Sequence, residues 1–322
     1  MQKILNEENY ASEMAWTVLP YLKERMKKGY MERIPGQSLY YEHYLADQPR
    51  GSIVLLHGFS EGIGKFYETV YYFLQEGFHV WMLQQREHGL SYRSTEDPYL
   101  IHIEKYEDLI LDLRAFVSGI VKADSETEGY PLYLFGHSLG GGVCACYIER
   151  YPDDFSRVIL NAPMLEMDSG NTPLWLAKAY TKARLAGKQD QKYMPGSHIF
   201  SGEDDFNNSC TDCRERYLYW LQEQRADIRL QMCVPSVRSA YEFLKLTKEA
   251  VSPENCAKIK ARVLLFQAGR ENMVKPHGQE TFIRQLGDKG SLILMKESKH
   301  EIYACRTREL QEYWEKILDF LS

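Results

Sequence analysis

Apolar and polar residues alternate along the chain in blocks that predict strands and helices in turn. Short, continuous apolar runs of the kind found in buried parallel strands cover residues 52–56, 77–83, 130–135, 157–162, 261–267 and 291–295. Apolar positions at helical spacing follow most of these runs, over about residues 65–76, 103–121, 276–286 and 307–321. Strands that alternate with helices predict an α/β fold, in which helices flank a mostly parallel central sheet.

Two further elements precede this alternation. Residues 9–28 carry apolar positions at roughly helical spacing, so we expect an N-terminal helix that packs on the body of the protein. Pro20 should kink or divide that helix, because proline cannot donate a backbone hydrogen bond. Residues 39–44 alternate like an outer strand of the sheet.

The alternation stops at Pro163 and resumes at Ala261. The intervening residues predict no strand and three helices, over 173–186, 211–225 and 237–250. We therefore expect an α/β core of residues 1–164 and 256–322 and a helical cap or lid of residues 165–255. The cap is inserted between the strands near 157–162 and 261–267, where loops carry function.

One short motif lies at the join between a predicted strand and a predicted helix. Residues 136–140 read Gly-His-Ser-Leu-Gly, a G-x-S-x-G pattern. At such a turn the pattern is the nucleophile elbow, which lifts a serine hydroxyl above the sheet on a strained backbone. Ser138 is therefore the candidate nucleophile.

A serine hydroxyl needs a general base and a carboxylate that orients this base. In this topology the acid and the histidine follow the serine in that order, at the ends of later strands. Glu271 follows the strand at 261–267 and His300 follows the last strand, so they are the candidate acid and base. Glu166 and Asp168, just after the preceding strand, remain rival acids.

Acyl transfer also needs donors for the tetrahedral oxyanion. The residue after the nucleophile supplies one backbone N–H group, and a loop after an earlier strand supplies another. Leu139 holds the first position. His57-Gly58-Phe59 follows the strand at 52–56, so the N–H group of Phe59 is the candidate second donor.

The predicted cap is rich in aromatic residues, and we expect most of them to form its core. A subset should line an apolar channel for an acyl group, with Trp175 and Tyr180 as candidate substrate-binding residues. Basic residues of the cap could meet a phosphate headgroup, although a solvated helix face is the favoured interpretation; they include Lys178, Lys182, Arg184 and Arg238.

Composition narrows the class of protein. The 322 residues carry a formal net charge of −6 and no basic run, which argues against nucleic-acid binding. The first residues lack the apolar core of a signal peptide, and no apolar run approaches membrane-span length. The seven cysteines are expected to be free thiols. These features favour a cytoplasmic protein, with secretion that uses no recognisable signal as the alternative.

Several motifs together resemble the α/β-hydrolase fold, over nearly all of residues 35–321. They are Gly136-His137-Ser138-Leu139-Gly140-Gly141, His57-Gly58-Phe59-Ser60-Glu61, Gln85-Arg86-Glu87-His88-Gly89-Leu90-Ser91, Asn161-Ala162-Pro163-Met164 and Lys299-His300-Glu301. Within that fold they resemble the bacterial lysophospholipase and monoacylglycerol lipase group of serine aminopeptidase-like hydrolases. The resemblance implies Ser138 as nucleophile, His300 as base and Glu271 as acid. Gln84, Glu87 and Glu271 stand where this group more often has Asp, Gly and Asp.

These observations predict a serine hydrolase that cleaves a carboxylic ester through an acyl-enzyme, with no cofactor and no metal. The expected substrate is a small-molecule or lipid ester, above all a lysophospholipid or monoacylglycerol, with no stable membrane insertion and at most transient membrane contact. One alternative is a serine aminopeptidase, whose amine-binding carboxylates could be Glu203, Asp204 and Asp205. A small-ester carboxylesterase and a non-catalytic binding protein on the same scaffold are the others.

Overall fold

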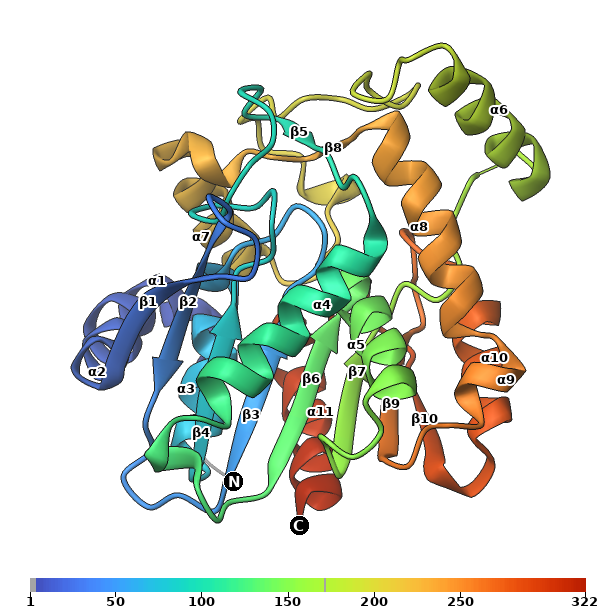
Figure 1. Cartoon of the computed structure of the whole chain (residues 1–322). Helices are drawn as coiled ribbons and strands as arrows, with labels where there is room; N and C mark the ends of the chain where they lie inside the picture. Colours follow the sequence, from blue (N-terminus) through green and yellow to red (C-terminus); the bar gives the residue numbers. More distant parts are fainter. Residues whose placement is uncertain (1–3, 171) are drawn as a thin grey trace.

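An eight-stranded sheet forms the centre of the protein, in a computed structural model that describes residues 4–170 and 172–322 (Figure 1). The strands lie in the order β1 (Met26–Glu32), β2 (Ser38–Tyr44), β4 (Phe78–Leu83), β3 (Gly51–Leu56), β6 (Leu132–His137), β7 (Arg157–Asn161), β9 (Arg262–Ala268) and β10 (Gly290–Met295). The pairs β1–β2 and β2–β4 are antiparallel and all the others are parallel. The predicted α/β fold with a mostly parallel sheet is thus confirmed.

Helices cover both faces of this sheet (Figure 1). On one face pack α1 (Tyr10–Glu13), α2 (Leu19–Arg25), α3 (Tyr67–Gln75) and α11 (Thr307–Leu321). On the other pack α4 (Tyr106–Phe116), α5 (Ser138–Arg150), α8 (Val237–Ala250), α9 (Pro253–Cys256) and α10 (Pro276–Leu286). Short 3-10 turns lie at Glu7–Asn9, Ile63–Phe66, Ser125–Thr127, Phe206–Asn208, Ile228–Leu230, Gly287–Lys289 and Ile302–Ala304, and π turns at Met14–Val18 and Val117–Val121.

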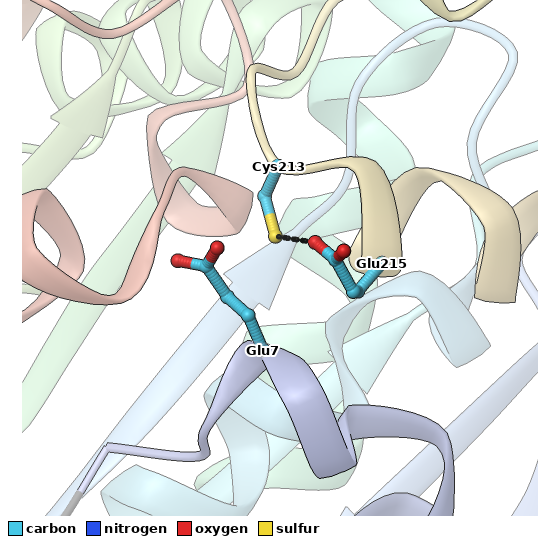
Figure 2. Close-up of side chains that lie close together, drawn as sticks. All are labelled: Glu7, Cys213 and Glu215. Carbon is cyan, nitrogen blue, oxygen red and sulfur yellow. Dashed lines mark hydrogen bonds between the residues drawn. The ribbon is translucent and has the colours of Figure 1, made fainter.

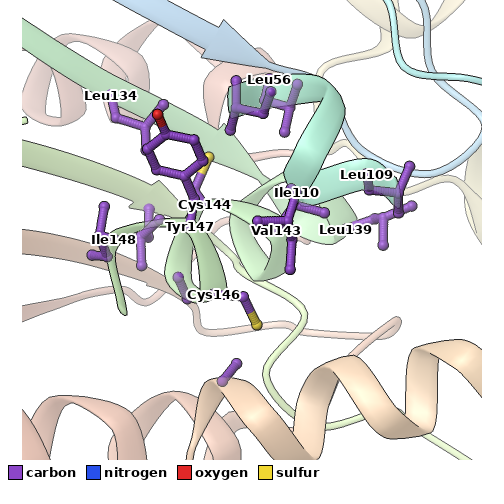
Figure 3. Packing of buried hydrophobic residues seen from close by; sticks show 14 of the residues in the cluster. Leu56, Leu109, Ile110, Leu134, Leu139, Val143, Cys144, Cys146, Tyr147 and Ile148 are labelled. Atoms are coloured by element: carbon purple, nitrogen blue, oxygen red, sulfur yellow. The ribbon is translucent and has the colours of Figure 1, made fainter. Parts of the chain in front are cut away.

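The period-two alternation of the strands builds two separate cores. In β3, Val54 and Leu56 point into the core under α4 and α5, whereas Ile53 and Leu55 point into the core under α3 and α11. All four side chains are fully buried, which explains the continuous apolar run in the sequence. Figure 3 shows how residues of α4 and α5 pack on the strands in the first of these cores.

The N-terminal segment differs from its prediction. The helical stretch ends at Arg25, and residues 26–28, which the predicted helix included, begin strand β1. Met26 is extended (φ −80°, ψ 128°) and pairs with Tyr44 of β2. Pro20 lies in the first turn of α2, directly after a π turn, so the expected division of the helix occurs there.

Between β7 and β9 the chain leaves the sheet, over the segment that was predicted to be a cap and that is called the cap below. Its helices are α6 (Leu174–Ala186), α7 (Arg214–Ala226) and α8, which match the three predicted ones. The segment also holds a strand that the sequence did not predict, β8 (Val234–Pro235), which pairs with the equally short β5 (Leu100–Ile101). This pairing ties the cap to the loop after β4.

A buried ion pair also joins helix α7 of the cap to helix α3 of the core. Arg216 of α7 donates to the carboxylate of Glu68 on α3 at 2.6 and 2.8 Å, and both side chains are almost fully buried.

Along the described residues, no helix is long and apolar enough to cross a membrane.

Candidate active site

The G-x-S-x-G turn lies where β6 ends and α5 begins. Ser138 is the first residue of α5 and has a φ of +50°, a left-handed conformation that is strained for a serine. A Cβ atom at Gly136 would lie 2.7 Å from the Cys144 sulfur, and one at Gly140 would lie 2.4 Å from the His57 carbonyl oxygen. Only glycine therefore fits at either side of this turn. The backbone has the geometry of a nucleophile elbow.

The loop after β3 packs directly on the elbow. A Cβ atom at Gly58 would lie 3.0 Å from the Cβ atom of Ser138. The backbone N–H of Gln85 donates to His57 Nε2 at 3.0 Å, so the proton of the neutral ring is on Nδ1, which lies 2.8 Å from the carbonyl oxygen of Gly58. Burial lowers the pKa of His57 and keeps this ring neutral.

That hydrogen bond also fixes the direction of the next N–H group. The C=O and N–H groups of a planar trans peptide point in opposite directions. Because the carbonyl of Gly58 faces the His57 ring, the N–H of Phe59 points away from it. The orientation is compatible with Phe59 as an oxyanion donor. Leu139, the other predicted donor, is the second residue of α5, where backbone N–H groups have no partner within the helix.

Glu271 and His300 meet at the ends of β9 and β10, as the sequence predicts. Nδ1 of His300 lies 2.9 Å from the Glu271 carboxylate, and both side chains are at most 5% exposed. Burial would raise the pKa of Glu271, but the His300 ring and the backbone N–H groups of Met273 and Val274 lower it below its usual value. The carboxylate is therefore ionised and holds the proton of His300 on Nδ1.

His300 also lies beside the elbow. Its ring centroid is 4.9 Å from that of His137, the residue before Ser138. Nε2 of His137 lies 3.4 Å from the backbone carbonyl oxygen of His300. Three segments that are far apart in the sequence thus meet at the same edge of the sheet, where open α/β sheets form their sites.

The two rival acids have other partners. Glu166 lies 2.8 Å from Nδ1 of His277, which is on the surface at the start of α10. Asp168 lies 2.8 Å from Nζ of Lys275, and this hydrogen bond lowers the pKa of its carboxyl. The geometry pairs His300 with Glu271.

The cap residues predicted to bind substrate lie apart from this centre. Tyr180 lines a cavity of about 580 Å³ between α6 and α8, together with apolar side chains such as Met194 and Leu244. Trp175 is 72% exposed and lines a neighbouring hollow of about 280 Å³. Among the described residues, neither Ser138 nor His300 lines either space.

The charged groups considered for substrate heads are on the surface of the cap. Glu203, Asp204 and Asp205 are exposed, and Asp204 is paired with Arg214 at 2.6 Å. Lys178 lines the hollow beside Trp175. None of these side chains is buried close to the serine.

One cluster of possible metal ligands lies near α7, away from the serine. Glu7, Cys213 and Glu215 lie together, and the Cys213 thiol donates to Glu215 (Figure 2). Burial raises the pKa of this thiol, and the cationic guanidinium of Arg216 lies 3.4 Å from its sulfur. A metal would need the deprotonated thiolate, and the guanidinium disfavours a second cation there. The cluster carries no link to the predicted chemistry.

Glu61, the last residue of the motif His57 to Glu61, had no predicted role but lies within the site. Its buried carboxylate lies 2.9 Å from Nδ1 of His137 and accepts a hydrogen bond from the hydroxyl of Tyr303 at 2.6 Å. The only sign of this role in the sequence is a glutamate three residues after Gly58. The sequence cannot show what this glutamate contacts, because its partners lie 76 and 242 residues away.

Comparisons with known proteins show which family and fold the chain shares. The family described as serine aminopeptidase, S33, matches residues 47–304. The chain is 31% identical over 154 residues to a monoacylglycerol lipase of Mycolicibacterium smegmatis, a match that spans 48% of this chain and 52% of that protein. It is 30% identical over 112 residues to lysophospholipase L2 of Escherichia coli, over 35% of this chain and 32% of that protein. The matched part thus spans about half or less of these relatives.

Two solved structures share the fold. A soluble variant of monoglyceride lipase from Saccharomyces cerevisiae superposes with a TM-score of 0.75 at 18% identity, over 92% of this chain and 95% of that one. A thermostable carboxyl esterase from Bacillus coagulans gives 0.74 at 16% identity, over 92% and 98%. At such identities the likeness shows the α/β-hydrolase fold alone.

Proposed function

Because the chain belongs to the serine aminopeptidase (S33) family of hydrolases, we propose that it is a serine hydrolase that cleaves carboxylic esters. The observation that carries this proposal is the buried hydrogen bond of 2.9 Å between Glu271 and His300, beside a strained serine at an elbow. Nucleophilic serine chemistry requires this combination of a base, a carboxylate that orients the base, and a serine hydroxyl as the nucleophile.

In the proposed mechanism the Ser138 hydroxyl oxygen attacks the ester carbonyl carbon while His300 accepts the hydroxyl proton. The oxyanion that forms accepts hydrogen bonds from the N–H groups of Phe59 and Leu139. The intermediate then collapses, the ester C–O bond breaks, and the imidazolium returns its proton to the leaving alcohol. A water molecule hydrolyses the acyl-serine by the same steps. Glu271 stays ionised throughout and stabilises the imidazolium.

We propose a monoacyl lipid, a lysophospholipid or a monoacylglycerol, as the substrate class. The names of the relatives, monoacylglycerol lipase and lysophospholipase L2, agree with this class. Contact with a lipid surface would then be transient, and nucleic acid is not an expected partner. We retain the cytoplasm as the proposed location, since all seven cysteines are free.

The test is hydrolysis of p-nitrophenyl esters of increasing chain length and of lysolipids by the wild type and by Ser138→Ala. The variant should lose a factor on the order of 10⁶ in kcat. Wild-type labelling by a fluorophosphonate, absent in the variant, would identify the acylated serine. A folded Ser138→Ala protein with near-normal ester turnover would refute the proposal, and an optimum at two to four carbons would indicate a small-ester carboxylesterase.

The family description itself favours a second candidate, a serine aminopeptidase. Such an enzyme needs carboxylates that hold the substrate amine near the serine. The candidates Glu203 and Asp205 are exposed, and Asp204 is neutralised by Arg214. Aminoacyl anilides assayed beside the lysolipids decide between the two activities.

A further inference from the structure

The carboxylate of Glu61 contacts three segments of the proposed active site, namely the oxyanion loop, the elbow and the turn after His300. Its Oε2 atom accepts from the backbone N–H of Gly58 at 2.5 Å and lies 2.9 Å from Nδ1 of His137. Its Oε1 atom accepts from the hydroxyl of Tyr303 at 2.6 Å. We propose that Glu61 is a positioning residue for the reaction. It holds the oxyanion loop, the elbow and the turn after His300 in their positions relative to one another; this rests on the proposed function.

The first consequence concerns the oxyanion donor. Glycine has the widest backbone freedom of any residue, so an unrestrained Gly58 would let the following N–H group point in many directions. Here the N–H of Gly58 is held by Glu61, and its C=O is held by Nδ1 of His57 at 2.8 Å. The two bonds restrain Gly58 on both sides. The N–H group of Phe59 is therefore preorganised, which is what makes such donors effective.

The second consequence concerns the base. Tyr303 lies in the short turn that follows His300, so its hydrogen bond to Glu61 restrains that turn. His137 lies between the two, with Nδ1 toward Glu61 and Nε2 3.4 Å from the carbonyl oxygen of His300. Glu61 thus contacts the elbow directly and the base through its neighbours, without touching the reacting atoms.

A buried carboxylate this close to a developing oxyanion would oppose it unless its charge is balanced. Nζ of Lys65 lies 3.4 Å from Glu61 and 2.6 Å from Glu301, and the Lys65 side chain is 11% exposed. Burial favours the neutral forms, but His137 and Lys65 hold the pKa of Glu61 well below its usual range. Burial likewise opposes the charge on Lys65, and Glu301 and Glu61 raise its pKa above the usual value. Lys65 thus offsets the negative charge of Glu61, while Glu61 still accepts hydrogen bonds with the strength of a carboxylate.

The test is Glu61→Gln, which keeps the shape but removes the negative charge and leaves one acceptor oxygen for the N–H group of Gly58, Nδ1 of His137 and the hydroxyl of Tyr303. Loss of a whole oxyanion donor lowers kcat by about 10²–10³. We expect a fall of roughly 10- to 100-fold in kcat, with KM nearly unchanged, because only the transition state uses the preorganised N–H group. The affinity of a phenylboronic acid, which forms a tetrahedral adduct with Ser138, should fall by a similar factor.

The matched control is Glu42→Gln. Glu42 is also buried and also accepts from tyrosine hydroxyls, those of Tyr40 and Tyr44, but it lies on β2 away from the serine. The Glu42→Gln variant should leave kcat and boronate affinity unchanged even if its melting temperature falls. A merely structural role for Glu61 predicts the same behaviour for both variants.

Tyr303→Phe removes only the hydrogen bond to Oε1, and it carries the test if Glu61→Gln does not fold. It should lower kcat several-fold, again without a matching change in KM. Wild-type kcat and boronate affinity in folded Glu61→Gln, or in Tyr303→Phe when the first variant is unfolded, would overturn the proposal. If Ser138→Ala retained activity, the proposed function would fail instead, so the two failures are distinguishable.

Discussion

Replacement of Glu149 by glutamine should make the protein more stable, and increasingly so as the pH rises. Glu149 lies near the end of α5 and is 2% exposed. Its Oε1 atom accepts from the Cys256 thiol at 3.7 Å, and its Oε2 atom has no hydrogen-bond partner among the described residues. Cys146 and Glu249 face it from α5 and α8, with Arg150 and Lys258 as the nearest cations. The site is therefore poorly suited to a charge.

The magnitude follows from the pKa of this carboxyl. Burial, and then the charge of Glu249, raise its pKa from 4.5 to about 8. Between these values the unfolded chain is ionised while the folded protein still holds the proton. The unfolded state binds fewer protons there, so stability falls as the pH rises through this window. Each pH unit is worth about 1.36 kcal/mol, so Glu149 destabilises the protein by about 1 kcal/mol at pH 5 and about 4–5 kcal/mol at pH 9.

Glutamine has the same shape and no titration, so Glu149→Gln removes this pH-dependent cost. Urea unfolding at pH 5, 7 and 9 should show a stability gain for the variant that grows by about 4 kcal/mol across the range, with little change in the m-value. Glu254→Gln on α9, which alters an exposed carboxylate, is the control and should not change the pH dependence. Parallel stability curves for Glu149→Gln and the wild type would refute the reasoning.

Three further predictions test other parts of the structure. Glu271→Gln should lower kcat by about 10⁴, whereas Glu166→Gln and Asp168→Asn should leave ester turnover within about twofold; the reverse result would move the acid to the earlier strand. Gly140→Ala places a methyl group 2.4 and 2.5 Å from the carbonyl oxygens of His57 and Leu56, so fluorophosphonate labelling should be lost even where circular dichroism shows a folded protein. Arg216→Met leaves Glu68 buried without its cation and should lower the free energy of unfolding by about 3–5 kcal/mol in urea titrations. Lys260→Met, at an exposed ion pair with Asp153, should change it by less than about 1 kcal/mol.

The elements that sequence alone could predict are those whose pattern reflects burial. The helices at 276–286 and 307–321 have the predicted bounds, because each buries one stripe of side chains against the sheet. Strand β1 was missed because it is an edge strand whose residues are mostly exposed, so no apolar alternation marks it. It forms through pairing with β2, a tertiary effect that overrides weak local preference.

Some residues of the site could likewise be predicted from the sequence, and others could not. Ser138, Glu271 and His300 could be proposed from the sequence because the chain order of this topology places nucleophile, acid and base after successive strands. The contacts of Glu61 could not, because nothing in the spacing links Gly58, His137 and Tyr303. The substrate side of the cap was equally out of reach, since the α6 side chains that the sequence suggested for a channel include Trp175, which faces solvent.

The glutamate at position 271, where the resemblance described above leads us to expect an aspartate, follows from the local backbone. Its Oε1 atom accepts from the N–H groups of Asn272, Met273 and Val274 at 2.9, 2.8 and 3.3 Å. The side chain thus folds over its own loop and still presents the carboxylate to His300 at 2.9 Å. An aspartate is one methylene shorter and would have to give up part of one set of contacts to keep the other. The longer side chain therefore fixes the loop and orients the base with a single carboxylate, and the departure from aspartate preserves the geometry on which the proposed chemistry depends.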